Sequence, residues 1–423
     1  DEADEEGWET ESIYDDLLNE DKPYVYVPGP DVCSPEECAY YKAKLHQYGL
    51  EDFVRRTIST HVITAKKLCT AFGVNPPPYV YCCSDEAYYP LLGLAIAREL
   101  NRRLKLPQYN TIEDAAELLR KAQNIIVITG AGISTSLGIP DFRSKNTGFY
   151  SRLRSMGFEE PEQVFDIHEF DENPRIFYSL AADILPDTPK WSPTHQFIRV
   201  LQDQGKLLRN YTQNIDNVEA NAGILPEKLV QCHGSWATAT CRKCGHKIPG
   251  TELFDDVKAK RVSRCKQCEQ TLRAPRPGMK RKRSSTSNKA RKWDDDDDDS
   301  DGAYDIPEPG VMKPDITFFG EQLPKDFFDK IRDVDKDKVD LVIVIGTSMK
   351  VAPVSEIPSF LRYDVPQIYI SRDPIYHIDF DINLLGYSDD VVTELCRRAR
   401  WDLKHEKVSN DQQFDVAVAE DSK

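Results

Sequence analysis

The sequence has no hydrophobic run of about 18 residues, the length that a membrane-spanning helix needs. It also has no secretory hydrophobic region near its start. The composition therefore gives no sign of a membrane protein. The chain begins at Asp1 and not at a methionine, so we expect it to be a piece of something longer, and a missing N-terminus would hide a leader. Its 423 residues suffice for two or three domains with at least one large core.

Positive charge is scarce: the sequence has 55 Lys and Arg residues against 71 Asp and Glu residues, which gives a net charge of −16. Net acidity argues against general nucleic-acid binding by the whole surface, and no direct sequence-specific contact with nucleic acid is expected. The charge is uneven. Residues 1–22 are acidic and predicted to be disordered. The charged insert 273–305 begins with a strongly basic run, which favours a nuclear import signal over a solvated insert without a role, and continues with an aspartate run.

The cysteines show no disulfide framework, so we expect a reducing compartment. Four of the eleven form two Cys-x2-Cys pairs, namely Cys241, Cys244, Cys265 and Cys268. Two such pairs complete a tetrahedron around zinc, and four thiolates leave no position for water, so the predicted zinc is structural. Neither His233 nor His246 is then needed as a ligand. We expect His246 at the surface, while a lone histidine such as His233 is more often structural than catalytic.

Residues 23–106 have a helical pattern. Ser34-Pro-Glu-Glu37 is typical of an N-cap, and residues 91–104 are amphipathic. We predict a small helical domain that serves packing or docking, because its sequence contains no catalytic signal. At the other end, residues 405–423 form a polar tail that we expect to be loose.

Residues 107–404 have an α/β pattern. A capping signal at Thr111 to Asp114 predicts a helix to about Ala122. Short β-branched apolar runs follow, separated by helical stretches, at 124–129, 207–212, 340–345 and 366–370. Strands of this kind are buried on both faces of a parallel sheet. We therefore predict a doubly wound core, interrupted by the segment 241–310.

Two glycine turns follow predicted strands, at Gly130-Ala-Gly132-Ile-Ser134 and Gly346-Thr-Ser348. Such glycines permit close approach of the backbone to a pyrophosphate at a helix N-terminus. Thr135 replaces the third glycine of the dinucleotide motif, and no acidic residue about twenty positions on is placed to hold a ribose. From these residues alone, the turn at 130–134 is compatible both with a nucleotide-binding site and with an ordinary glycine turn after a buried strand. The loop 138–144 that follows contains no feature that decides between them.

Together these stretches resemble the sirtuins, the NAD-dependent protein deacylases. The matching motifs occur in family order over about residues 110–400 and are GAGIS (130–134), GIPDFRS (138–144), TQNID (212–216), HG (233–234), the four cysteines, KPDITFFGE (313–321) and GTSMKVAPVSEI (346–357). They look most like the nuclear branch, in particular the fungal silencing deacetylases. The resemblance implies a large Rossmann-like domain with a small zinc-binding and helical domain inserted in it, the zinc-binding segment being 241–268.

The resemblance also implies that NAD and an acetyl-lysine peptide enter a cleft between these domains from opposite sides. It assigns NAD contacts to Gly130, Ala131, Gly132, Ser134, Pro140, Asp141, Phe142, Arg143, Phe149, Gln213, Asn214, Ile215, Asp216, Gly346, Thr347, Ser348, Ser371, Arg372, Asp373 and Ser388. It also implies that the peptide lies between two short strands of the protein. The residues expected to contact the peptide are Ile316, Thr317, Phe318, Phe319, Gly320, Glu321, Lys350 and Val351. Ser371-Arg-Asp373 departs from the family's Asn-Arg-Glu, and Ser388 stands where a cysteine is usual.

By the same resemblance His233 is the general base, with Asn214 beside it. The acetyl oxygen attacks C1′ of the nicotinamide ribose, and the base activates the 2′-hydroxyl to attack the resulting imidate. The products are deacetylated lysine, nicotinamide and O-acetyl-ADP-ribose, so NAD is consumed and not reduced. The expected protein is a nuclear histone deacetylase in chromatin silencing, with a silencing partner on its helical domain. The alternative hypothesis is a silencing scaffold that acts mainly by binding partners. An NAD-linked oxidoreductase is the weakest of the three hypotheses.

Overall fold

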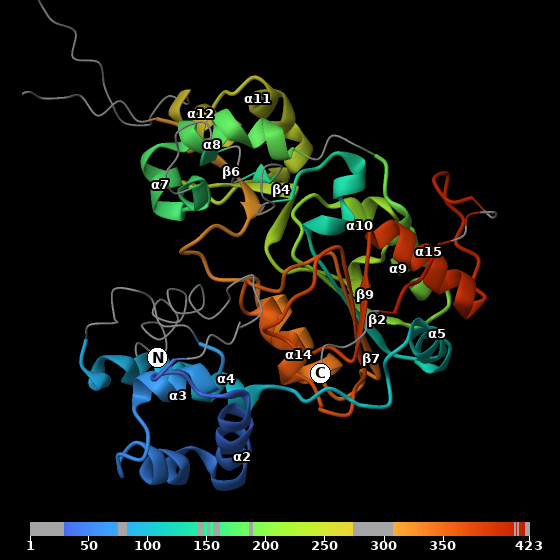
Figure 1. Cartoon of the computed structure of the whole chain (residues 1–423). Helices are drawn as coiled ribbons and strands as arrows, with labels where there is room; N and C mark the ends of the chain where they lie inside the picture. The colour runs from blue at the N-terminus through green and yellow to red at the C-terminus, as the bar shows by residue number, and fades with distance from the viewer. Residues whose placement is uncertain are drawn as a thin grey trace, which may run out of the picture.

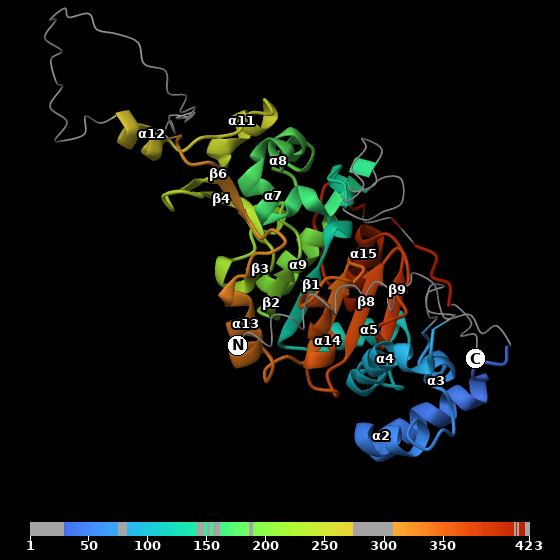
Figure 2. The ribbon, with the colours of Figure 1, turned by 90° about the vertical axis from the view of Figure 1, so that its left-hand side faces the viewer.

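The computed structural model describes residues 29–74, 83–141, 148–149, 153–154, 161–185, 189–273, 308–409, 412 and 414–418. Within them the chain forms a helical domain, a large domain around a parallel sheet, and a small domain with an antiparallel sheet. In both ribbon views the helical domain and the small domain lie at opposite ends of the large domain (Figures 1 and 2). No helix in these ranges is long and apolar enough to span a membrane.

Six strands of the described residues form one parallel sheet in the order β3-β2-β1-β7-β8-β9 (Figure 2). Their bounds are β1 Ile125–Thr129, β2 Leu207–Thr212, β3 Leu229–Gln231, β7 Leu341–Ile345, β8 Gln367–Ser371 and β9 Ile382–Leu385. The four predicted runs are confirmed as strands. The chain moves from β1 outward to β3 and then returns to the other side of β1, at β7. In open α/β sheets such a reversal places the ligand crevice at the carboxyl ends of the two central strands.

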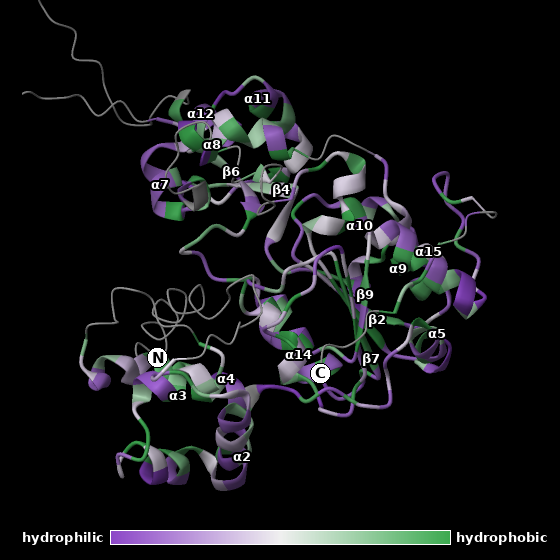
Figure 3. Cartoon of the chain, in the orientation of Figure 1, coloured by the Kyte–Doolittle hydropathy of each residue, from purple (hydrophilic) through white to green (hydrophobic). Residues whose placement is uncertain are grey.

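The sheet is buried on both faces, as its continuous apolar runs predict. Ile125 and Val127 of β1 join the core beneath α5 (Ile112–Lys121), α9 (Pro193–Asp203) and α15 (Ser388–Ala399). Ile126 and Ile128 point to the core on the other face, which includes residues of α13 (Lys325–Lys330) and α14 (Ile357–Phe360). Figure 3 accordingly shows the strands of this sheet as predominantly hydrophobic, and the surrounding helices with both hydrophobic and hydrophilic residues.

The small domain is built on a three-stranded antiparallel sheet in the order β5-β4-β6. Its elements are β4 Gly234–Cys241, β5 Lys247–Pro249, β6 Met312–Ile316, α7 Ile167–Glu172, α8 Pro174–Leu180, α11 Phe254–Lys258 and α12 Lys266–Arg273. The ring of Phe318 packs against those of Phe165, Phe170 and Phe177 with centroids 5.2 to 5.7 Å apart. Strand β4 starts next to His233 and ends at a cysteine, so one strand spans this domain.

Short elements complete the described chain. They are α10 Val218–Asn221, the 3-10 turns η2 Asp85–Tyr88, η3 Ala131–Ile133, η4 Thr135–Leu137, η5 Pro161–Phe165, η6 Ala181–Ile184, η7 Pro226–Lys228, η8 Gly250–Leu253 and η10 Val354–Glu356, and the π-helical turn η9 Ile331–Asp335. Several of them follow the carboxyl ends of the strands, such as η3 after β1 and α10 after β2.

The helical domain comprises α2 (Pro35–Thr57), α3 (Ala65–Ala71) and α4 (Tyr89–Asn101), with a hydrophobic core of its own. The predicted caps at Ser34 and at Thr111 are both confirmed as capping boxes. The predicted helix at 91–104 is too long: it ends at Asn101, and Leu104 is 72% exposed.

The two residues after this helix contact the large domain. Arg102 pairs with Asp379 at 2.5 Å, and the buried Arg103 pairs with the buried Asp381 at 2.7 Å. At the other end of the chain, packing continues past Lys404, since Lys407 Nζ donates to the main-chain oxygen of Ser136 at 2.9 Å.

Candidate functional site

The two glycine turns meet at the ends of β1 and β7. The amide of Gly132 donates to the oxygen of Gly346 at 2.8 Å, and the amide of Gly130 donates to the oxygen of Ile345 at 3.1 Å. A Cβ atom added at Gly132 would lie 2.7 Å from the oxygen of Gly346. Gly346 has a φ of +63°, in the left-handed region, and a Cβ there would lie 2.8 Å from the nitrogen of Ile133. The glycines are therefore required for the turns to pack against each other, besides leaving room for a ligand backbone.

The turn after β1 leads into η3 and η4, which are short 3-10 turns, so the long helix that a dinucleotide motif usually opens is absent from this described stretch. Side chains hold the turn instead. Ser134 Oγ donates to Asp216 Oδ2 at 2.7 Å, and both residues are buried. Ser192 Oγ donates to the oxygen of Ile133 at 3.0 Å. Two of the predicted residues, Ser134 and Asp216, thus fix each other across the crevice.

The residues after β2 connect the two turns. Asn214 Nδ2 donates to the oxygen of Gly130 at 3.2 Å, and the amide of Asn214 donates to Thr212 Oγ1 at 3.0 Å. Gln213 Oε1 accepts from Thr347 Oγ1 at 2.6 Å. One loop therefore contacts the ends of both central strands, and the predicted residues Gln213, Asn214 and Thr347 come together.

His233 lies at the end of β3, directly before the small domain. Its Nδ1 lies 3.0 Å from the main-chain oxygen of Gln213. Because a carbonyl oxygen only accepts, Nδ1 holds the proton and Nε2 has the lone pair. Nε2 is buried and has no hydrogen-bond partner among the described residues. Burial lowers the pKa of the ring, against the opposing effect of the bond to Gln213, so the imidazole is neutral at neutral pH and suited to accept a proton.

The predicted peptide segment adjoins His233. The amide of Thr317 donates to the oxygen of His233 at 2.9 Å, and the amide of Phe319 donates to the oxygen of Phe165 at 2.7 Å. An open hollow of about 360 Å³ adjoins this segment and is lined by Lys313, Asp315, Ile316, Thr317, Glu321 and Gln322. The expectation of short strands is wrong here, because β6 ends at Ile316 and residues 351–353 form a bend and a turn. Beyond Ile316 the segment diverges from β4 to reach Phe165.

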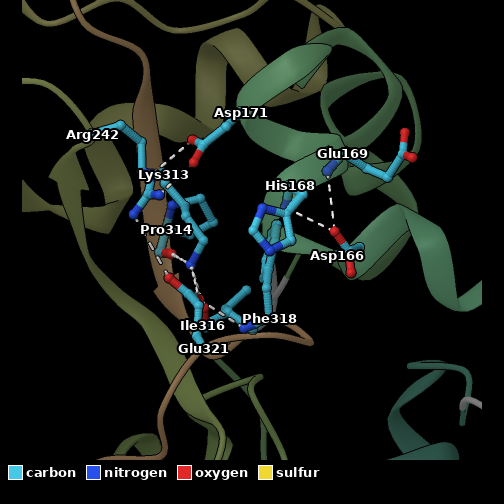
Figure 4. A network of polar contacts seen from close by, with 10 residues as sticks. All are labelled: Asp166, His168, Glu169, Asp171, Arg242, Lys313, Pro314, Ile316, Phe318 and Glu321. Carbon is cyan, nitrogen blue, oxygen red and sulfur yellow. Dashed lines mark hydrogen bonds and ion pairs between the residues drawn. The ribbon is translucent and has the colours of Figure 1, made fainter.

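An ion pair between the buried Lys313 and the partly buried Glu321 shapes this segment (Figure 4). Lys313 Nζ donates to Glu321 Oε2 at 2.7 Å and to the oxygen of Ile316 at 2.6 Å, and it lies 4.1 Å from the centre of the Phe318 ring. Glu321 Oε2 also accepts from the amide of Phe318 at 2.8 Å. Burial lowers the pKa of Lys313, and Glu321 opposes that shift. The pair closes the loop 316–321 on itself.

The ion pair continues into the cysteine segment, as Figure 4 also shows. Arg242 lies between two cysteines and pairs with Asp171 of α7 at 2.5 Å. Its Nη1 lies 3.9 Å from Glu321 Oε1. The first cysteine turn is thereby connected to the loop 316–321 through charged side chains.

The four cysteines converge as predicted. Their sulfur atoms all lie within 4.8 Å of one another, with Cys241 and Cys268 3.8 Å apart and Cys244 and Cys265 3.7 Å apart. A tetrahedron with Zn–S bonds of about 2.3 Å has edges of about 3.8 Å. The amide of Lys243 also points to the sulfur of Cys241 at 3.4 Å, as in a metal knuckle. The four cysteines are therefore positioned to bind one structural zinc, whereas His246 is exposed, as expected.

Other residues predicted to contact NAD lie outside the group formed by the two glycine turns and the loop after β2. Phe149 is 1% exposed and packs against Phe165 with ring centroids 6.0 Å apart, in the core of the small domain. Arg372 and Asp373 are exposed and pair with each other at 3.0 Å. Ser371 ends β8 and Ser388 begins α15, both at the strand edge that contains the crevice.

The last of the predicted residues differ in exposure. The partly buried ones are Ala131, Gly132, Pro140, Asp141, Lys350 and Val351. Ile215 is buried, whereas Ser348, Phe319 and Gly320 are exposed. Phe142 and Arg143 lie outside the described residues.

Sequence reasoning also missed Glu219, a fully buried acid on α10 whose carboxyl group contacts the ends of β1 and β2. The one signal in the chain was its position three residues after Asp216, at the start of a helix. That spacing is equally compatible with an exposed N-terminal acid.

Comparisons with known proteins were made on the whole chain. A family model described as the Sir2 family matches residues 130–353. The NAD-dependent histone deacetylase sir2 of Schizosaccharomyces pombe is 46% identical over 358 residues, which cover 84% of this chain and 74% of that protein. The NAD-dependent protein deacetylase HST1 of Saccharomyces cerevisiae is 46% identical over 331 residues, covering 78% of this chain and 63% of the relative. The NAD-dependent histone deacetylase SIR2 of the same yeast is 45% identical over 323 residues, covering 75% and 55%. The chain thus spans less than two thirds of the two Saccharomyces proteins.

Proposed function

This chain belongs to the Sir2 family, and from that premise we propose that it is an NAD-dependent protein-lysine deacetylase that acts on histones. The overall reaction converts acetyl-lysine, NAD and water to lysine, nicotinamide and O-acetyl-ADP-ribose. The names of the similar proteins support histones as the substrate class. The contacts among the described side chains at the carboxyl ends of β1, β2 and β7 support this proposal.

The single observation that supports this function best is the state of His233. Its Nδ1 is held by a main-chain oxygen, and its Nε2 is buried with no partner in the described part of the chain. A buried nitrogen without a partner costs free energy, so it is expected where a ligand supplies the missing donor. A ribose hydroxyl is such a donor. Nε2 would take its proton and so make the oxygen nucleophilic.

The residues around His233 have positioning roles in this proposal. NAD supplies an electrophilic ribose carbon when it is bound. The interlocked turns at Gly132 and Gly346 would face its phosphates. Asn214 contacts the oxygen of Gly130, and the main-chain oxygen of its neighbour Gln213 accepts from His233 Nδ1. Thr317 donates to the main chain of His233, which brings the peptide segment next to the base. Phe142 and Arg143 are proposed to complete the NAD contacts.

The site is tested with a panel of acetylated histone-tail peptides, incubated with and without NAD. We expect deacetylated peptide only when NAD is present. A folded protein that deacetylates without NAD, or does not deacetylate at all, would overturn the proposal. The same peptides with propionyl or longer acyl groups define the acyl range.

A second role, in docking, is supported by the separate core of α2 to α4. We propose that residues 23–106 recruit a silencing partner, and that the basic run of the insert 273–305 directs the protein to the nucleus. Arg103 and Leu106 both bond to the buried Asp381, so they belong structurally to the large domain. A truncation should therefore end at residue 101. The truncated protein should retain peptide deacetylation and lose recruitment of the partner. Loss of both would show that the helical domain and the large domain form one functional unit.

A further inference from the structure

Glu219 lies on α10, beneath the carboxyl ends of β1 and β2, with a relative exposure of 0%. An acid is rarely buried to this extent without a charged partner. Among the described residues it makes no ion pair. Its partners are two threonine hydroxyl groups, on Thr129 and Thr212, which both donate to Oε1.

Two hydrogen-bonded chains end at this oxygen. In the first, Asn210 Nδ2 donates to Thr129 Oγ1 at 3.2 Å, and Thr129 Oγ1 donates to Glu219 Oε1 at 3.3 Å. In the second, the amide of Asn214 donates to Thr212 Oγ1 at 3.0 Å, and Thr212 Oγ1 donates to the same Oε1. Each hydroxyl donates its single proton to Glu219 and accepts from the preceding group through a lone pair. The direction of both chains is set by the carboxyl group.

The second oxygen, Oε2, is buried and has no partner among the residues that the structure describes. If the group were ionised, Oε2 would be an unsolvated charge, whereas in the acid form it is only an unpaired hydroxyl, which costs much less. Asp216, three residues earlier, has donors on both oxygens, from Ser134 at 2.7 Å and from the amide of Val218 at 3.0 Å. The geometry therefore places the single negative charge on Asp216 and leaves Glu219 neutral.

We propose that Glu219 is a positioning residue, whose neutral carboxyl group terminates both chains and so holds the main chain of Asn214 and the end of β1 in the geometry that the site requires. Ionisation of Glu219 would place a second charge beside Asp216 and loosen this loop. The inference deepens the proposed function and rests on it, because Asn214 contacts the turn at Gly130 and directly follows Gln213, whose main-chain oxygen accepts from His233.

The electrostatic surroundings agree with this assignment. Burial, followed by the charge of Asp216, raises the pKa of Glu219 to about 8. Burial raises the pKa of Asp216 as well, while Ser134 and Val218 lower it. The other titratable group that faces Glu219 is the thiol of Cys232 after β3, whose pKa is raised by burial. Glu219 is therefore neutral below about pH 8, and among the described residues Asp216 is the charged group that raises its pKa.

Two variants separate positioning from simple packing. Glu219→Gln keeps an acceptor for both threonines and cannot ionise, whereas Glu219→Ala removes the acceptor. We expect kcat/KM for NAD of the unmodified protein to decline as pH rises through about 8, and that of Glu219→Gln to stay level there. Glu219→Ala should lose about ten-fold or more at every pH. Glu227→Gln, at an exposed position, is the matched control and should keep the alkaline decline.

A measurement independent of activity uses hydrogen exchange of the peptide spanning residues 212–218. Exchange should be faster in Glu219→Ala than in the unmodified protein, and it should accelerate above about pH 8 in the unmodified protein, beyond the intrinsic increase, but not in Glu219→Gln. An alkaline decline shared by Glu219→Gln, or unchanged exchange in Glu219→Ala, would overturn the inference. A protein with the expected exchange but no deacetylation would instead overturn the proposed function alone.

Discussion

Nδ1 of His233 hydrogen-bonds to the main-chain oxygen of Gln213 at 3.0 Å. The side chain of Gln213 at the same time accepts from Thr347, at the end of β7. The tautomer of the histidine is therefore set by the backbone of the loop that joins the two central strands. No substitution of a partner side chain can release it, and its orientation depends on the integrity of the crevice itself.

Replacement of His233 by alanine should abolish turnover without affecting the fold. A general base contributes about 100-fold or more to a rate, while removal of the ring also removes a buried nitrogen without a partner. We expect kcat to fall by at least that factor, with zinc content and thermal midpoint retained. His246→Ala is the control, because His246 is exposed. Normal turnover in His233→Ala would exclude His233 as the base.

The acid side of the pH profile reports on the same ring. Burial lowers the pKa of His233 below its ordinary value. The neutral base form therefore persists to lower pH, so the midpoint of the acid-side decline in kcat/KM should lie below about pH 6.5, the ordinary value for histidine. A midpoint above that value would mean that the ring is not buried as described.

The cysteine cluster should contain one zinc per chain. Cys241 ends β4 and packs in the hydrophobic core of the small domain, so Cys241→Ala should lose the metal and unfold that domain. Activity would be lost indirectly, through the loop 316–321. Cys83→Ser, at an exposed cysteine, should retain both metal and activity. Active protein without zinc by elemental analysis would contradict this account.

The pair of Lys313 and Glu321 should control binding of the peptide and not of NAD. Lys313→Met removes the cation that holds Glu321 and the oxygen of Ile316, so the loop 316–321 loses its closure. We expect the KM for peptide to rise about ten-fold, while the KM for NAD stays within about two-fold. Lys247→Met is the matched control, since its lysine is 61% exposed and its surface ion pair with Asp315 contributes little. Equal changes in both KM values would argue for general unfolding.

Gly132→Ala tests the interlocked turns. The new methyl group would meet the main-chain oxygen of Gly346 at 2.7 Å, and backbone cannot move aside as a flexible side chain can. Overpacking of this kind costs about 1–3 kcal/mol, and binding of NAD should weaken as the turns separate. Gly93→Ala on α4 meets nothing within 4 Å, so it should be neutral or slightly stabilising. Equal stability and NAD affinity in Gly132→Ala would refute the interlock.

Three of the four predicted strands are rich in β-branched residues, such as residues 341–345, whereas the fourth, β2, also contains Arg209 and Asn210. β3 and β9 were not predicted, because each is only three or four residues long and mixes polar with apolar side chains. Their place in the sheet depends on tertiary pairing with β2 and β8. The zinc cluster was predictable since its ligands are close in sequence and of one chemical type.

The chemistry of the crevice was less accessible. Spacing alone could show only that His233 was not needed for zinc, and the resemblance to a family supplied its role. Lys313 and Glu219 were missed for a common reason. Both are ionisable residues surrounded in sequence by polar and apolar neighbours, where an exposed side chain is the ordinary expectation. Only the three-dimensional packing shows that they are buried.

The central claim is that the chain consumes NAD in deacetylation with His233 as base. Its most direct test quantifies deacetylated histone peptide, nicotinamide and reduced NAD in one reaction, for the unmodified protein and for His233→Ala. The account predicts equal amounts of peptide product and nicotinamide, no reduced NAD, and loss of peptide product in the variant. Peptide product without nicotinamide, accumulation of reduced NAD, or undiminished product from His233→Ala would contradict it.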